Sequence, residues 1–162
     1  MKLIAIDPGP SESGICVIDS ESYRPLNAGK TQNELILDKL ELPSETKELH
    51  VVIEMVGHYG TGMPAGSAVF DTCVWIGRYM QWFLDSGISV SLMMRMDVKM
   101  NLCGTSRAKD SNIRQALVDR FAPTTKNYGK GTMKDPGFFY GFAADMWQAY
   151  ALGVTYLDKE KV

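Results

Sequence analysis

The distribution of apolar residues along the chain predicts five β-strands. Two continuous apolar runs, residues 1–7 and 49–55, each end near a carboxylate and are typical of buried central strands. Pro8-Gly9-Pro10 separates the first run from the next, so these two strands are expected to form a hairpin. The predicted strands span residues 1–7, 14–19, 26–29, 49–55 and 88–93.

Apolar residues that recur every three or four positions predict four helices. The clearest case is residues 66–86, where Val69, Cys73, Ile76 and Met80 follow this spacing. The predicted helices span residues 32–40, 66–86, 110–121 and 138–157, with a loop rich in Lys, Gly and Pro at 122–137. This order of elements predicts one α/β domain over residues 1–162 with a mixed β-sheet.

Composition is that of a globular domain. The 162 residues (18.0 kDa) are 45% apolar and 22% charged, which argues against disorder and fibrous repeats. No apolar run reaches the ~18–20 residues of a membrane span, so no membrane partner is expected. Cys16, Cys73 and Cys103 form no CxxC pair, which fits a reducing, cytoplasmic location and argues against disulfides or a zinc knuckle.

The charge is unevenly distributed along the chain. The net charge of −2 and a pI of about 5.7 argue weakly against a protein that coats nucleic acid. Residues 1–94 carry 6 basic and 12 acidic residues, residues 95–134 carry 9 and 3, and residues 135–162 carry 2 and 4. The central third therefore has a net charge of +6, and we expect a basic face there.

Three carboxylates stand in apolar surroundings. Asp7 and Glu54 follow buried strands, and Asp145 is the only acid between Asp135 and Asp158. If the two strands are neighbours, Asp7 and Glu54 meet at one edge of the sheet, and close carboxylates need a cation between them. Oxygen donors without His or Cys select Mg²⁺ or Mn²⁺. The alternatives are a turn residue for Asp7, a solvent-reaching strand end for Glu54 and an exposed helix residue for Asp145.

In their order and spacing, several short motifs resemble RuvC-type Holliday junction resolvases, which have the RNase H-like fold. The resemblance covers most of the chain and implies a sheet of three antiparallel strands followed by two parallel ones, flanked by helices. The motifs are Ile6-Asp7-Pro8-Gly9 with Gly14, Val52-Ile53-Glu54, Ser67-Ala68-Val69 with Ile76-Gly77-Arg78, Val98-Lys99 with Gly104 and Ala108, and Ala143-Ala144-Asp145 with Ala149 and Ala151.

The sequence departs from this family at two positions. The family usually has an acidic residue three positions before the last Asp, and here that residue is Phe142. The position of the family's Lys in the basic segment is Asp110, with Lys109 beside it. Either Asp110 or Asp135 replaces the fourth metal ligand, or three carboxylates suffice.

The resemblance implies a catalytic site and a reaction. Asp7 would bridge two Mg²⁺ or Mn²⁺ ions, Glu54 and Asp145 would each hold one, and Asp110 is a further catalytic candidate. Two such ions stabilise the attacking water and the leaving 3′-oxygen of a phosphodiester. The implied products carry 5′-phosphate and 3′-hydroxyl ends.

The resemblance also implies branched DNA, such as a four-way junction, as the partner. Lys99, Arg107, Lys109 and Arg114 are candidates to contact phosphates, although Lys109 and Arg114 also fit a solvated helix face. Tyr59, on a Gly-rich loop after Glu54, either stacks on an unpaired base or packs on the sheet edge.

The family works as a homodimer, and the helix predicted at residues 66–86 is apolar on more than one side, so one side is a candidate dimer surface. Two other functions stay open. One is an RNase H-fold nuclease for flaps, RNA–DNA hybrids or RNA. The other is a junction-binding protein that does not cleave, and Phe142 at the fourth ligand position supports it.

Overall fold

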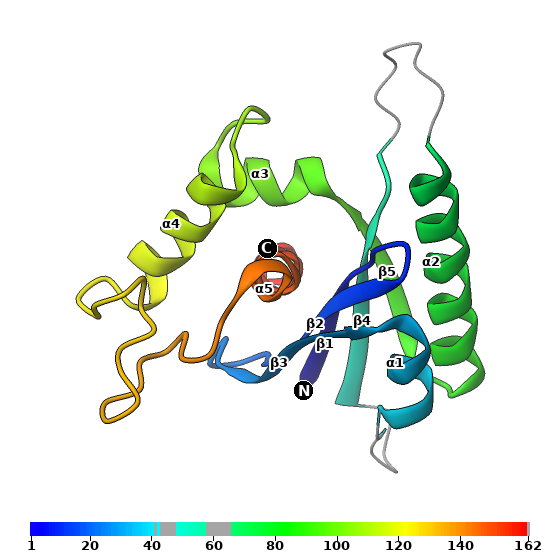
Figure 1. The fold of residues 1–162 in the computed structure, drawn as a ribbon, viewed down its shortest axis with the longest axis horizontal. Helices are drawn as coiled ribbons and strands as arrows, with labels where there is room; N and C mark the ends of the chain where they lie inside the picture. The colour runs from blue at the N-terminus through cyan, green and yellow to red at the C-terminus, as the bar shows by residue number, and fades with distance from the viewer. Residues whose placement is uncertain (41, 43–47, 58–65, 162) are drawn as a thin grey trace.

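The computed structural model describes residues 1–40, 42, 48–57 and 66–161. Its centre is a five-stranded sheet in the order β3-β2-β1-β4-β5 (Figure 1). The first three strands pair antiparallel, β4 pairs with β1 in parallel, and β5 pairs with β4 in parallel. This is the mixed sheet expected from the sequence. The strands are β1 (Lys2–Asp7), β2 (Glu12–Asp19), β3 (Pro25–Gln32), β4 (Leu49–Met55) and β5 (Ser89–Met94).

Helices cover both faces of the sheet. In Figure 1, α1 and α2 lie on one side, and α5 packs on the other with α3 and α4 beyond it. Neighbouring residues of β1 point to opposite faces, so Leu3 and Ala5 join the core under α5, whereas Ile4 and Ile6 join the core under α2. The helices are α1 (Asn33–Lys39), α2 (Ser67–Asp85), α3 (Arg95–Cys103), α4 (Asp110–Phe121) and α5 (Ala144–Glu160). None of these helices is long and apolar enough to cross a membrane.

The sequence pattern missed α3. This helix is mostly polar or exposed and buries only Val98, so it has no amphipathic stripe to detect. Tertiary contacts hold it, because Lys159 of α5 pairs with Asp97 at 2.6 Å and Asn101 bonds to Asp158 at 2.8 Å.

The predicted start of the last helix was also wrong. The helix begins at Ala144, whereas residue 138 was expected. Phe139 and Phe142 are buried against Trp147 and Tyr150 before the helix starts, so their apolar character reflects an aromatic core and not a helical stripe.

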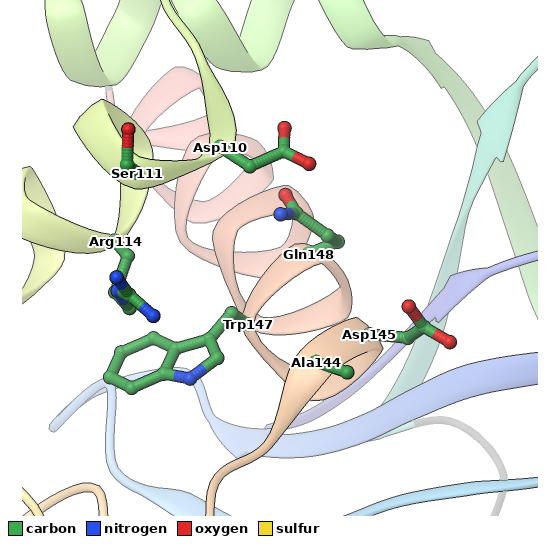
Figure 2. A pocket seen from close by; sticks show the side chains of 7 residues that line it. All are labelled: Asp110, Ser111, Arg114, Ala144, Asp145, Trp147 and Gln148. Carbon is green, nitrogen blue, oxygen red and sulfur yellow. The ribbon is translucent and has the colours of Figure 1, made fainter.

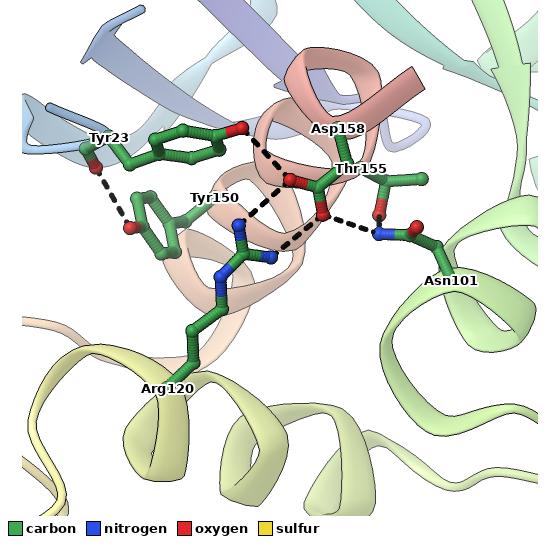
Figure 3. Close-up of polar contacts among 6 residues, drawn as sticks. All are labelled: Tyr23, Asn101, Arg120, Tyr150, Thr155 and Asp158. Carbon is green, nitrogen blue, oxygen red and sulfur yellow. Dashed lines mark hydrogen bonds and ion pairs between the residues drawn. The ribbon is translucent and has the colours of Figure 1, made fainter. Parts of the chain in front are cut away.

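Asp158, near the end of α5, links this helix to α3, to α4 and to Tyr23, which lies between β2 and β3 (Figure 3). It accepts two hydrogen bonds from Arg120 of α4, at 2.7 and 2.8 Å, and one from the Tyr23 hydroxyl at 2.9 Å. Tyr23 has the left-handed φ of 61°, and the Tyr150 hydroxyl donates to its carbonyl at 2.9 Å. Burial raises the pKa of Asp158, but the hydrogen bonds outweigh burial and hold this pKa below its ordinary value.

We predict that Asp158→Asn lowers the free energy of unfolding by about 2 kcal/mol near neutral pH, because hydrogen bonds from charged and hydroxyl donors are lost. The pKa of Asp158 is depressed in the folded state, so its contribution is present above about pH 4 and disappears as pH falls through the folded pKa. Urea unfolding at several pH values measures this. Asp119→Asn on the exposed side of α4 is the control, and an equal loss in both variants would contradict the assignment.

Candidate active site

Three elements bring the candidate carboxylates to one edge of the sheet. Ile6 of β1 is level with Ile53 of β4 in a parallel pair, so the next residues, Asp7 and Glu54, end at the same edge. Asp145 reaches this edge from the first turn of α5. A Cβ on Gly14 would lie 2.6 Å from the carbonyl oxygen of Asp145, so only glycine at this position lets α5 approach β2 so closely.

Burial and mutual repulsion control the protonation of this cluster. Burial first, and then the neighbouring Glu54 carboxylate, raise the pKa of Asp7 to about 7. Asp145 and Asp110 act in the same direction, and the Arg95 guanidinium opposes them. Burial also raises the pKa of Glu54, opposed by Arg95. The edge therefore favours a cation among these carboxylates.

Two basic residues that sequence reasoning missed contact the cluster. Arg95, the first residue of α3, donates to Glu54 at 3.4 Å and also pairs with Asp110. Only 15% of its side chain is exposed. Lys30 of β3 pairs with Asp145 at 2.9 Å and with Glu12 at 3.3 Å. Arg95 was hidden because α3 was not predicted, and Lys30 because the third strand was expected to end at residue 29.

The candidates for a fourth acidic ligand differ in their distance from the carboxylate cluster. Asp110, the first residue of α4, lies close enough to Asp7 and Glu54 to raise the pKa of both. Asp135 lies in the loop between α4 and α5, where its backbone N–H bonds to Thr132. Phe142 is buried in the aromatic core. The structure thus brings Asp110 to the cluster and gives no such contact for Asp135.

A cleft of about 340 Å³ lies between α4 and the start of α5 (Figure 2). Asp110, Ser111 and Arg114 line it from α4, and Asp145 and Gln148 line it from α5. The Gln148 Oε1 atom is buried and has no hydrogen-bond partner among the described residues. Ala144 and Trp147 add apolar surface to the lining, and the cleft leads from α4 to Asp145 of the carboxylate cluster.

The structure places the other predicted contact residues, apart from Tyr59, on α3 and directly before α4. Lys99 of α3 is half-buried and near enough to lower the pKa of Glu54. Arg107 and Lys109 are exposed just before α4, and Lys109 is its N-cap residue. Tyr59 lies outside the described residues.

The donor chemistry fits divalent ions. Asp7, Glu54 and Asp145 offer only carboxylate oxygens, which hard cations such as Mg²⁺ prefer. Within the described ranges, no group of three or more Asp, Glu, His or Cys side chains is yet arranged to hold a metal. Glu54 pairs with Arg95 and Asp145 pairs with Lys30, while Asp7 has no ion pair among the described residues.

The fold is similar to that of solved RuvC structures, which confirms the resemblance at the level of fold. Thermus thermophilus RuvC superposes with a TM-score of 0.67 at 16% identity, over 99% of this chain and 96% of that one. The T. thermophilus RuvC structure in complex with a Holliday junction substrate gives 0.69 at 15% identity, over 99% and 95%. Fowlpox virus resolvase, in complex with substrate Holliday junction DNA, gives 0.59 at 13% identity, over 97% and 99%. No protein-family model and no curated protein matches the sequence.

We predict that Asp7→Asn stabilises the metal-free protein by about 2–4 kcal/mol near pH 8. The raised folded pKa means that the wild type loses stability as pH rises from about 4 through 7, and the amide removes this loss. Thermal unfolding across this range measures the effect, with the exposed Glu21→Gln as control. Added Mn²⁺ should then stabilise the wild type more than Asp7→Asn; a gain independent of pH would contradict the assignment.

Proposed function

We propose that this chain is a metal-dependent endonuclease that cuts branched DNA, with the four-way Holliday junction as its substrate. The observation that carries the proposal is the convergence of Asp7, Glu54 and Asp145 at the carboxyl edge of a RuvC-type sheet. Sheet edges of this kind are where α/β folds place ligands. Two of the similar structures are complexes with Holliday junction DNA, which supports the substrate class.

The carboxylates would hold two divalent ions, Mg²⁺ or Mn²⁺, with Asp7 shared and Glu54 and Asp145 on either side. Bound ions of this kind supply Lewis-acid stabilisation of the attacking water and the leaving 3′-oxygen, which gives 5′-phosphate and 3′-hydroxyl ends. Asp110 is the candidate for a fourth acidic group. Arg95 and Lys30 neutralise part of the cluster, and Lys30 would keep a second carboxylate partner, Glu12, if Asp145 held an ion.

Basic residues around the cleft would bind the phosphates of the substrate. Among the described residues, Lys99, Arg107, Lys109 and Arg114 form no ion pair with a carboxylate. Their charges are therefore available to an external anion. Contacts of this type position the nucleic acid and weaken as salt increases.

One side of α2 would be the surface of a homodimer. Phe70, Cys73 and Val74 are exposed there, with Phe70 63% and Val74 60% exposed, and Leu84 continues the row. A Cβ on Gly77 would meet nothing within 4 Å, so the middle of the row is open to a partner. Figure 1 shows α2 as the outermost element on its side of the sheet. A two-fold dimer suits a junction with two symmetric cuts.

A specific observation favours a second function, a junction-binding protein that does not cleave. The fourth acidic position of the family is Phe142, which is buried, and Arg95 and Lys30 already pair with two of the carboxylates. In that case the basic cleft would bind DNA, and the carboxylates would have no catalytic role.

We predict Mg²⁺- or Mn²⁺-dependent cutting of a mobile four-way junction, tested beside a flap and an RNA–DNA hybrid. Asp7→Asn should reduce cutting by at least about 100-fold and keep binding, because the metal ligand is lost while the basic residues stay. Glu48→Gln, exposed at the opposite end of β4, is the matched control. Binding of the junction without cutting any substrate would favour the second function.

The same cutting assay tests whether Asp110 or Asp135 supplies a fourth acidic group. Asp110→Asn is expected to slow cutting, and Asp135→Asn is expected to leave the rate unchanged, because only Asp110 lies near the cluster. Unchanged rates in both variants would show that three carboxylates suffice.

We predict that Val74→Glu shifts the protein from dimer to monomer, because a charge at the centre of an apolar interface is costly to bury. Sedimentation velocity measures the oligomeric state. Leu26→Glu introduces the same charge at a residue of β3 that is 52% exposed, and this variant should remain a dimer. A monomeric wild type would contradict the proposed interface.

A further inference from the structure

Residues 122–143 connect α4 to α5 by a long loop that contains no named helix or strand. Loops longer than about 12–15 residues are uncommon inside compact domains and are usually either functional or disordered. Backbone hydrogen bonds give this loop a defined shape: Gly131 to Lys126 at 3.1 Å, Gly137 to Lys130 at 2.8 Å and Phe139 to Gly129 at 3.0 Å. Because this long loop is ordered, it is expected to have a functional role beyond connecting α4 to α5.

Gly129 and Tyr128 show how firmly the loop is held. A Cβ on Gly129, whose φ is +74°, would lie 2.7 Å from both Ala122 and Phe139, so this turn packs directly on the aromatic core. Tyr128 has a φ of 53°, which is unfavourable for a bulky residue, although its side chain is 51% exposed. Asn127, Tyr128 and Gly129 are consecutive left-handed residues, so this turn fixes where the Tyr128 ring lies.

Tyr128 links the loop to the candidate active site through Arg114. The Arg114 guanidinium lies 4.5 Å from the centre of the Tyr128 ring, within the range of a cation–π contact. Arg114 also lines the cleft that contains Asp110 and Asp145, and Figure 2 shows it extending from α4 toward Trp147. The loop surface is therefore continuous with the cleft.

The loop adds unneutralised positive charge to that surface. Lys126, Lys130 and Lys134 recur along it, against the single acid Asp135. In the part of the chain that the structure describes, none of these lysines pairs with a carboxylate, whereas Lys30, Arg95, Arg120 and Lys159 do. An uncompensated row of lysines attracts a polyanion.

We propose that the loop at residues 122–143 is a second DNA-contacting element, which binds the phosphate backbone of the duplex arm next to the cleft. Lys126, Lys130 and Lys134 bind phosphates, and Tyr128 positions Arg114 toward the cleft. A duplex backbone fits better than stacked single-stranded bases, because Arg114 already covers one face of the Tyr128 ring. This inference rests on the proposed function and extends it to a surface away from the carboxylates.

The test is the salt dependence of junction binding, measured without divalent metal so that cutting does not interfere. The triple variant Lys126→Gln, Lys130→Gln, Lys134→Gln should bind about 10-fold or more weakly near physiological salt. The slope of log K against log salt should fall by about 2–3, because up to three phosphate contacts are lost.

A second triple variant removes the same charge elsewhere. Lys2→Gln, Arg24→Gln, Lys161→Gln changes three exposed cations outside the loop and should keep the wild-type affinity and slope. Thermal unfolding of both triple variants confirms that they fold. If the loop variant binds with the wild-type affinity and slope, the inference is overturned and the proposed function stands. If the wild type neither binds nor cuts the junction, the proposed function itself has failed and the inference fails with it.

Tyr128→Ala tests the positioning role, with Tyr128→Phe as its match because phenylalanine keeps the ring that Arg114 contacts. Tyr128→Ala should weaken binding by a few-fold, and adding Arg114→Gln to it should cost little more, since the two residues act as a unit. Equal effects of the two tyrosine variants, or full additivity with Arg114→Gln, would contradict this role.

Discussion

Asp7 and Glu54 follow strand residues that are fully buried, and the cost of keeping their charges at this edge determines how the rest of the site is arranged. Burial and proximity both disfavour ionisation, which explains why the pKa of Asp7 rises to about 7. The fold offsets this cost with Arg95 from α3, which pairs with Glu54 and Asp110, while Lys30 from β3 pairs with Asp145 and Glu12. Arg95 and Lys30 each supply one positive charge to the cluster, and a divalent ion would interact more strongly with the same carboxylates.

The approach of α5 to the sheet makes this arrangement possible. Gly153 of α5 has no space for a side chain, because a Cβ there would lie 2.3 Å from Ile18 and 3.1 Å from Ala5. Gly14 plays the same part at the other end of the contact, beneath Asp145. Two glycines, one on the helix and one on the sheet, thus determine the distance between Asp145 and the strand carboxylates. At the far end of α5, Asp158 attaches the helix to α3, α4 and Tyr23.

The contacts in the structure show which cations of the basic central third, residues 95–134, are paired with carboxylates and which are not. Its charge of +6 contains two kinds of cation. Arg95 and Arg120 are paired with carboxylates and serve the fold and the cluster. The cations around the cleft and along the α4–α5 loop have no such partner among the described residues. A protein whose net charge is −2 thus presents a positive surface beside its acidic site.

The sequence alone predicted the five strands and most of the helices, because buried strands and amphipathic helices leave periodic apolar patterns. It also singled out three carboxylates in apolar surroundings, which the fold brings to one edge of the sheet. It could not predict α3, whose residues lack an apolar stripe, or the true start of α5, because the apolar Phe139 and Phe142 precede the helix. Only the tertiary structure decided that Arg95, Lys30 and Asp110 meet the cluster and that Tyr128 supports Arg114. These contacts join residues far apart in the chain, and their energies depend on burial and distance, which no local pattern records.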